Sequence, residues 1–261
     1  PATTEPAATD PGQPDAAPAA PAAPAAPSAP DASSSGGGAS ASTVSANLSR
    51  GVVLITTVGP VGSGAGTGMV LTADGQVLTN YHVVEGSSSI KVTLADGGKT
   101  YTATVVGHDA QRDVALLQLN GASGLATVTP DNDTLTVGAA VTMVGNANGQ
   151  GYLSAASGVV TDTSSTVTVA DEANVTGSET LTGVIQTNAA AVPGDSGGPT
   201  FDAEGEVTGM TTAGSQTLGR RGRGAVTTTS FAVPIDTAMK VIEQIRSGKE
   251  SGTVEIGGRP Y

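Results

Sequence analysis

From Gly51 onward the chain is a succession of short apolar or alternating runs separated by glycine, aspartate and asparagine residues. The runs have the length of strands and are rich in β-branched residues, as in GVVLITTV, TGMVLT, IKVTLA and DVALLQL. β-Branched side chains pack well on a pleated surface, whereas Gly, Asp and Asn favour turns. About a dozen such runs in one chain are typical of a barrel or a sandwich. We therefore predict an all-β fold.

One late segment has the periodicity of a helix instead. In DTAMKVIEQIRSG an apolar stripe is formed by Ala238, Val241, Ile242 and Ile245. Arg246 in the last turn fits a helix end, so we expect a helix at about 236–247. Many strands followed by one helix predict two small barrels packed together, with the helix closing the second.

The first 43 residues differ in composition from the rest of the chain. They carry nine of the 15 prolines and no aromatic or basic side chain. Such a segment cannot bury enough apolar area to offset the entropy lost on ordering. We expect a disordered linker over 1–44 and a folded domain over 45–250, with barrels at about 45–130 and 131–234.

The charge of the chain limits its partners. The formal net charge is -12, which repels both phosphate backbones and anionic lipid surfaces, so we expect no nucleic-acid partner. No apolar run is long enough to span a bilayer, and the chain begins at Pro1 rather than Met. We expect any membrane attachment to depend on an upstream anchor that lies outside this sequence.

Three short motifs resemble phosphate, dinucleotide and calcium sites, but each lacks residues that such a site requires. GGKT at 97–100 lacks the first glycine of a phosphate loop, and GSGAGTG at 62–68 misses the dinucleotide spacing, so we interpret it as a flexible loop. DNDT at 131–134 lacks the rest of a calcium loop and is interpreted as a turn. With no cysteine and only two histidines, we predict no metal and no cofactor.

The stretch AVPGDSGGPT at 191–200 offers a candidate nucleophile, Ser196. Glycines on both sides permit a sharp turn that would point the serine hydroxyl outward. The same turn can aim the N–H groups of Gly194 and Ser196 at one point, as a pocket for a developing oxyanion requires. The alternative is an ordinary turn in a Gly/Ser loop.

A serine nucleophile needs a base, and only His82 and His108 are available. His82 follows a predicted strand and is expected to be partly buried, whereas His108 lies in a polar turn and is interpreted as a surface residue. The base needs a carboxylate partner. Asp113 opens the apolar run DVALLQL, which would leave its carboxylate at a barrel edge, and Asp109 is a solvated alternative.

Five blocks of the sequence together resemble the HtrA/Deg family of trypsin-like serine proteases, and most closely its actinobacterial members. They are TGMVLTADGQVLTNYHVVEG, HDAQRDVALLQL, VGNANGQGYLSAASGVVTD, GVIQTNAAAVPGDSGGPTFDAEGEVTGMTT and SFAVPID. The blocks occur in the order of the family and span roughly 50–247.

The resemblance implies a double six-stranded β-barrel of the chymotrypsin type. It implies that His82 is the general base, Asp113 its orienting carboxylate and Ser196 the nucleophile, with the Gly194 and Ser196 amides as the oxyanion hole. It also implies a specificity pocket lined by Ala190, Ala191, Thr212, Ala213 and Gly214. These residues carry no carboxylate, so we expect small or medium apolar side chains at the cut site.

The sequence departs from the family pattern at two positions near Ser196. Asn188 stands where the family usually has Asp, and Asp195 stands where many members have Asn. We expect Asp195 to have a local structural role. Relatives usually continue into a PDZ domain, so we expect 251–261 to be a linker. The basic cluster of Arg220, Arg221 and Arg223 is either a solvated loop or a loop that meets an acidic partner.

The resemblance implies a serine endopeptidase that cleaves unfolded or damaged proteins through an acyl-enzyme. Its expected setting is protein quality control or stress response outside the cytoplasmic membrane, in the cell envelope or secreted. One alternative is a latent or inactive protease-like domain that binds polypeptide, and another is a secreted digestive protease. The sequence leaves open whether the protein is a monomer or a trimer.

Overall fold

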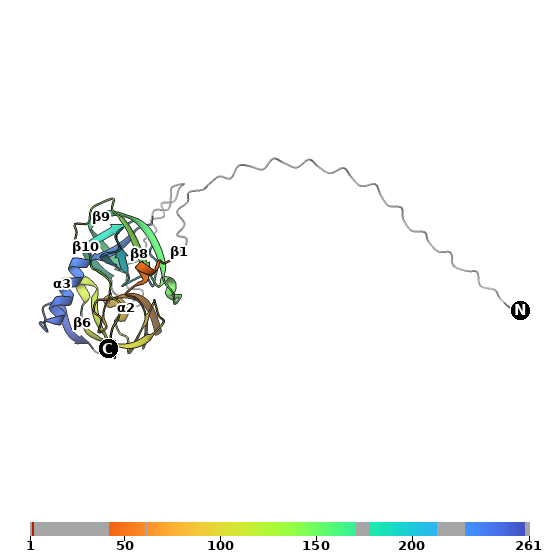
Figure 1. The fold of residues 1–261 in the computed structure, drawn as a ribbon, viewed down its shortest axis with the longest axis horizontal. Coiled ribbons are helices and arrows are strands. Elements are labelled where there is room, and N and C mark those ends of the chain that lie inside the picture. Colours follow the sequence, from red (N-terminus) through yellow and green to blue (C-terminus); the bar gives the residue numbers. More distant parts are fainter. Residues whose placement is uncertain (1, 3–41, 61, 171–177, 213–227, 259–261) are drawn as a thin grey trace. The chain divides into compact units, whose positions relative to one another are not determined.

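The computed structural model describes residues 2, 42–60, 62–170, 178–212 and 228–258 (Figure 1). Its strands form two closed antiparallel barrels, which confirms the predicted all-β double barrel. The strands of the first barrel are β2 (Val52–Gly59), β3 (Gly62–Val70), β4 (Gln76–Thr79), β5 (Ser89–Leu94), β6 (Thr100–Asp109) and β7 (Val114–Leu119). They pair in the order β6-β5-β2-β3-β4-β7, and pairing of β6 with β7 closes the barrel.

The second barrel has the same closed form. Its strands are β8 (Ala140–Gly145), β9 (Ser154–Ala170), β10 (Ser178–Thr187), β11 (Pro199–Phe201), β12 (Val207–Thr211) and β13 (Ser230–Pro234). They pair in the order β9-β10-β13-β12-β11-β8, and β8 pairs with β9 to close the barrel. In Figure 1 these strands run from green to blue, beside the orange and yellow first barrel.

Two short strands extend the barrels. β1 (Ser42–Thr43) pairs with β9, and β14 (Val254–Gly258) pairs with β6 from Val254↔Asp109 to Gly258↔Val105. Both fall in segments expected to be linkers, 1–44 and 251–261. The described end of the chain is therefore part of the first barrel's sheet.

The helices are few among the described residues. α1 (Ala46–Ser49) and α2 (Tyr81–Val84) are single turns, and α3 (Ile235–Arg246) lies one residue before the expected helix. The 3-10 turns are η1 (Ala110–Arg112) and η2 (Ala147–Gly149). No helix in the described part of the chain is both long and apolar enough to cross a membrane.

One apolar core runs between the barrels and under α3. Burial of this surface is the main favourable contribution to holding the barrels together. The buried cluster includes Met69 and Leu78 of the first barrel, Phe201 and Met210 of the second, and Ile242 of α3. A separate apolar cluster lies inside each barrel, one in the first barrel and one in the second.

The glycine-rich segment 62–68, expected to be a flexible loop, is instead part of β3. It pairs with β2 residue by residue, from Gly59↔Gly62 to Val52↔Met69. Alternate residues of a strand share one face. On that face a Cβ at Gly66 would lie 2.5 Å from the Val83 side chain, and one at Gly68 would lie 2.9 Å from Val77. Close packing therefore requires glycine at positions 66 and 68, and the prediction of a flexible loop was wrong.

Candidate active site

His82 and Asp113 meet at the end of the first barrel. His82 lies in α2, directly after β4, and its Nδ1 is 2.8 Å from Asp113 Oδ2. The His82 backbone N–H donates to Asp113 Oδ1 at 3.0 Å. The His82 side chain is 43% exposed and that of Asp113 only 2%. Two contacts with one buried carboxylate therefore fix the imidazole while leaving part of the ring open.

The buried carboxylate of Asp113 is well supplied with donors. Thr212 Oγ1 donates to Asp113 Oδ2 at 2.6 Å, in addition to both His82 contacts. The Asn80 side-chain amide donates to the Asp113 carbonyl at 3.0 Å and holds the backbone. Asp113 has a φ of 54°, which turns the chain from η1 into β7. Such hydrogen bonds offset the cost of burying a charge.

Asp109, the alternative carboxylate, has a different set of partners. It is fully buried and accepts from the Arg112 guanidinium, from the Arg112 backbone N–H at 3.1 Å and from Thr253 Oγ1 at 3.1 Å. These contacts tie η1 to the segment before β14. Asp109 is therefore a structural ion-pair residue in this fold, and the expectation of a solvated side chain was wrong.

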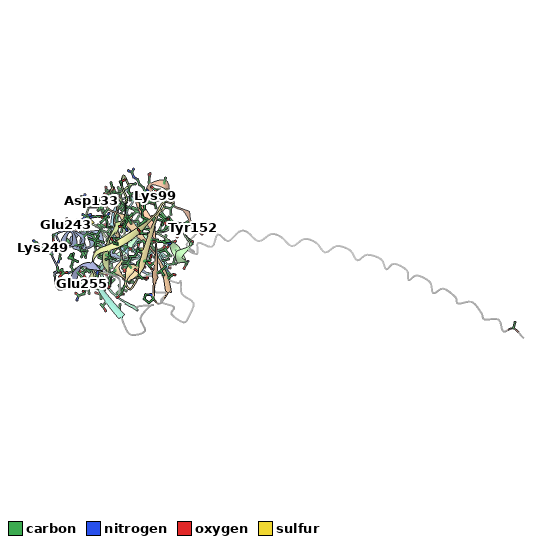
Figure 2. All side chains as sticks on the ribbon, turned by 90° about the horizontal axis from the view of Figure 1, so that it is seen from below. Lys99, Asp133, Tyr152, Glu243, Lys249 and Glu255 are labelled. Atoms are coloured by element: carbon green, nitrogen blue, oxygen red, sulfur yellow. The ribbon has the colours of Figure 1, made fainter. Side chains whose placement is uncertain are left out.

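His108, expected at the surface, is only 9% exposed. Its ring stacks on that of Tyr81 with centroids 4.1 Å apart and planes 5° apart. Its Nε2 lies 3.7 Å from Oε2 of Glu255, whose side chain is at the surface of the molecule (Figure 2). His108 thus packs behind the helix that carries His82.

The loop around Ser196 has every carbonyl from 193 to 196 engaged. Asn148 N donates to Pro193 O at 2.6 Å, and Gly198 N donates to Asp195 O at 2.9 Å. The Gly194 and Ser196 carbonyls accept from the hydroxyl and the backbone N–H of Thr67, at 2.7 and 2.9 Å.

These contacts also fix where the N–H groups of the loop point. In a planar trans peptide the C=O and the following N–H point in opposite directions. Asp195 N donates to Val192 O and Gly197 N to Thr211 O, whereas the Gly194 and Ser196 amides have no acceptor among the described residues. Two unpaired N–H groups beside a serine hydroxyl are the arrangement that an oxyanion hole needs.

Thr212 links the serine to the carboxylate. Ser196 Oγ donates to the Thr212 carbonyl at 3.1 Å, while the Thr212 hydroxyl binds Asp113. Sequence reasoning placed Thr212 only in the specificity pocket. No local pattern pairs residues 113 and 212, which are 99 positions apart, so this contact was found only in the structure.

The expected specificity pocket is only partly described. Ala190 is half-buried, whereas Ala191 is 1% exposed and packs in the core of the second barrel. Neither side chain carries a charge. Ser230, which sequence reasoning missed, accepts from Ala191 N at 3.1 Å and donates to the Ala189 carbonyl at 2.8 Å. Ala213 and Gly214 lie outside the described residues, as do Arg220, Arg221 and Arg223.

The two departures from the family pattern both have local contacts. Asn188 Oδ1 accepts from Val159 N at 2.7 Å and fastens the segment before the pocket to β9. Asp195 Oδ2 accepts from Val192 N at 2.9 Å, and its Oδ1 is buried without a partner in the described part of the chain. Burial raises the pKa of the Asp195 carboxyl to about 6.

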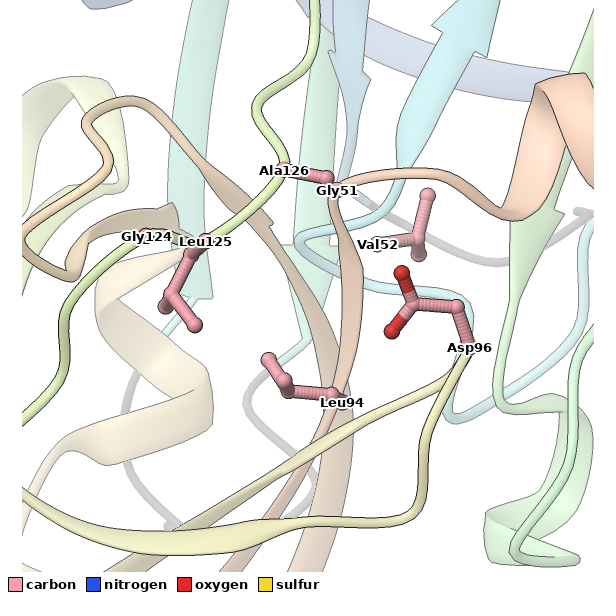
Figure 3. A pocket seen from close by; sticks show the side chains of 7 residues that line it. All are labelled: Gly51, Val52, Leu94, Asp96, Gly124, Leu125 and Ala126. Carbon is pink, nitrogen blue, oxygen red and sulfur yellow. The ribbon is translucent and has the colours of Figure 1, made fainter.

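Two other features lie apart from these residues. A cavity of about 230 Å³ is lined by Gly51, Val52, Leu94, Asp96, Gly124, Leu125 and Ala126 (Figure 3). The carboxylates of Asp131, Asp202 and Glu206 lie within 4.8 Å of one another. Oδ1 of Asp131 accepts from Asp133 N, and Oδ1 of Asp202 accepts from Glu206 N, so both carboxylates cap turns.

The chain is similar to known proteases in both sequence and structure. The sequence pattern of the trypsin-like peptidase domain matches residues 66–210. The chain belongs to the trypsin-like peptidase family. This protease domain is 27% identical to the active form of the Rv3671c protease from M. tuberculosis, with a TM-score of 0.63 over 83% of this chain and 88% of that one. It is 30% identical to the HtrA-type protease AlgW with tripeptide, with a TM-score of 0.63 over 78% and 64%.

Curated relatives place the protease domain among HtrA-type enzymes, which confirms the resemblance. It is 40% identical over 98 residues to the periplasmic serine endoprotease DegP of Escherichia coli strain K12. It is 40% identical over 100 residues to the periplasmic pH-dependent serine endoprotease DegQ of the same strain. The alignments cover 37% and 38% of this chain, and about a fifth of each relative's length, 20% and 22%.

Proposed function

We propose that this HtrA-type domain is a serine endopeptidase that acts through an acyl-enzyme. Ser196 Oγ attacks the carbonyl carbon of a peptide bond while His82 takes the hydroxyl proton. His82 then gives that proton to the leaving amine, and the C–N bond breaks. Water, deprotonated by His82, hydrolyses the ester and releases Ser196. Asp113 orients the ring throughout and stabilises its protonated form.

One observation above all supports this proposal. A buried carboxylate binds His82 at both the ring and the backbone, and its third donor, Thr212, also accepts the hydrogen bond of Ser196. A structural histidine in a barrel has no need of this arrangement, whereas general-base catalysis needs a fixed tautomer and a partner for the imidazolium.

The attacking hydroxyl has to change its hydrogen bond before reaction. A serine hydroxyl has one proton to donate, and Ser196 donates it to the Thr212 carbonyl. Attack requires that proton to turn toward His82. The oxyanion that forms is then stabilised by the Gly194 and Ser196 amides, which have no acceptor among the described residues.

We propose unfolded or damaged polypeptides as substrates, cleaved after small or medium apolar residues. The half-buried side chain of Ala190 supports this preference, because it offers no charge to pair with lysine or arginine. The curated relatives DegP and DegQ are named as periplasmic endoproteases, which supports a site of action outside the cytoplasmic membrane.

The test is hydrolysis of an unfolded casein-type substrate, with Ser196→Ala as the control and cut sites mapped by mass spectrometry. We expect peptide release that falls by about 10³-fold or more in the variant, as for removal of a catalytic nucleophile. We expect cuts after alanine, valine and similar residues. Equal release by both proteins would refute the assignment of Ser196, and cuts confined to lysine or arginine sites would refute the apolar pocket.

A further inference from the structure

Thr67 has an unusual set of contacts for a residue of the first barrel. It lies in β3 and is completely buried. Its hydroxyl donates to Gly194 O at 2.7 Å and accepts from Asn146 N at 2.9 Å. Its backbone N–H donates to Ser196 O at 2.9 Å, so three of its hydrogen bonds reach the second barrel.

These contacts restrain both peptide units of Gly194, the 193–194 peptide that carries its N–H group and the 194–195 peptide that carries its carbonyl. Thr67 Oγ1 holds the Gly194 carbonyl directly. The same oxygen holds the amide of Asn146 at the start of the turn 146–149, in which Asn148 N binds Pro193 O at 2.6 Å. One hydroxyl therefore supports the loop at Gly194 and also the turn that keeps the Pro193 carbonyl away from the oxyanion hole.

The loop needs such a restraint because its backbone is intrinsically free to turn. Gly194 has a φ of 96°, and a Cβ there would lie 2.3 Å from Asn146 O, so only glycine fits. Glycine populates many backbone conformations at low cost. If the 193–194 peptide rotated, the Pro193 carbonyl would replace the Gly194 N–H group and the oxyanion would lose a donor.

We propose that Thr67 is a positioning residue that holds the oxyanion loop in its active conformation from the opposite barrel. The inference rests on the proposed endopeptidase function and extends it to a residue that does not touch substrate. The hydroxyl is the part of Thr67 that acts, because it alone joins Gly194 and Asn146.

The experiment compares Thr67→Val with Thr67→Ser. Valine keeps the shape and removes the hydroxyl, and serine keeps the hydroxyl. Steady-state rates are measured with a peptide anilide that has alanine at the cut site, together with the affinity of the matching peptide boronate. We expect Thr67→Val to lower kcat about 10- to 100-fold with KM nearly unchanged, somewhat less than the loss of a full oxyanion donor. Boronate affinity, which reports on the tetrahedral adduct, should fall in parallel.

Thr67→Ser should retain most of kcat. Thr208→Val is the control for general loss of a buried hydroxyl, because Thr208 Oγ1 donates to the Thr200 carbonyl at 3.2 Å, away from the loop. This control is expected to lower the melting temperature and leave kcat and boronate affinity as in the wild type.

A folded Thr67→Val variant with kcat within about threefold of the wild type would overturn the inference, since a lost oxyanion donor costs far more. If Thr67→Val does not fold, the kcat of Thr67→Ser is compared with that of Thr67→Ala, because the two variants differ only in the hydroxyl. Equal kcat in those two would also overturn it. A wild type that cleaves no anilide, or a Ser196→Ala variant as active as the wild type, would instead refute the proposed function.

Discussion

At the scale of single residues, burial of the Asp195 carboxyl lowers the stability of the folded protein at the loop next to Ser196. Its carboxyl is only 5% exposed, one oxygen binds Val192 N, and the other has no partner in the described part of the chain. Burial raises its pKa from 3.8 to about 6. The folded protein therefore holds a proton that the unfolded chain releases between about pH 4 and pH 6.

This linkage gives a stability prediction with a defined sign. Because the pKa of Asp195 is higher in the folded protein than in the unfolded chain, ionisation of this carboxyl lowers the free energy of unfolding. The loss is absent below pH 4, grows up to about pH 6 and then stays constant. Asparagine cannot ionise, so Asp195→Asn should raise the free energy of unfolding at pH 7.5 by on the order of 1–3 kcal/mol. At pH 3.5 the two proteins should differ little. Urea unfolding at both pH values measures the free energy of unfolding of the two proteins. An equal stabilisation by Asp195→Asn at both pH values would contradict a raised pKa at Asp195.

At the scale of elements, the glycine-rich strand β3 brings the two barrels into contact at the site. Thr67 binds the oxyanion loop, and Gly66 lies so close to α2 that a Cβ would be 2.5 Å from the Val83 side chain. That same Cβ would lie 3.3 Å from Ser196 O. β3 thus sets the distance between the helix that carries His82 and the loop that carries Ser196.

A methyl group added to β3 should therefore disturb both neighbours. We expect Gly66→Ala to destabilise the fold by about 1–3 kcal/mol, as for other overpacked sites, and to lower kcat because Val83 is next to His82. Gly97→Ala is the matched control, since a Cβ at Gly97 meets nothing within 4 Å. Chemical unfolding and anilide hydrolysis test both variants. If the two variants gave equal stability and rate, close packing at Gly66 would not be what requires glycine.

At the scale of the whole molecule, the sequence predicted the succession of strands and those candidate residues that stand in a recognisable local sequence. Alternating β-branched runs indicated the barrels, and glycine spacing and strand position made Ser196 and His82 candidate site residues. Contacts across long separations could not be predicted, as with Thr67 and Gly194, which are 127 positions apart. β3 was misread because glycine is rare inside strands, and β14 because its pairing partner lies in the first barrel.

The proposed function requires that Ser196 and the Gly194 and Ser196 amides be ready to react in this chain without a partner. Stoichiometric labelling with a fluorophosphonate, followed by intact mass measurement and peptide mapping, tests this requirement. Attack by Ser196 on phosphorus needs both His82 and the Gly194 and Ser196 amides. We expect one adduct per chain, located on Ser196, formed without any activating partner and absent in Ser196→Ala. No adduct in the wild type, or an adduct on another residue, would show that the site is not assembled as proposed.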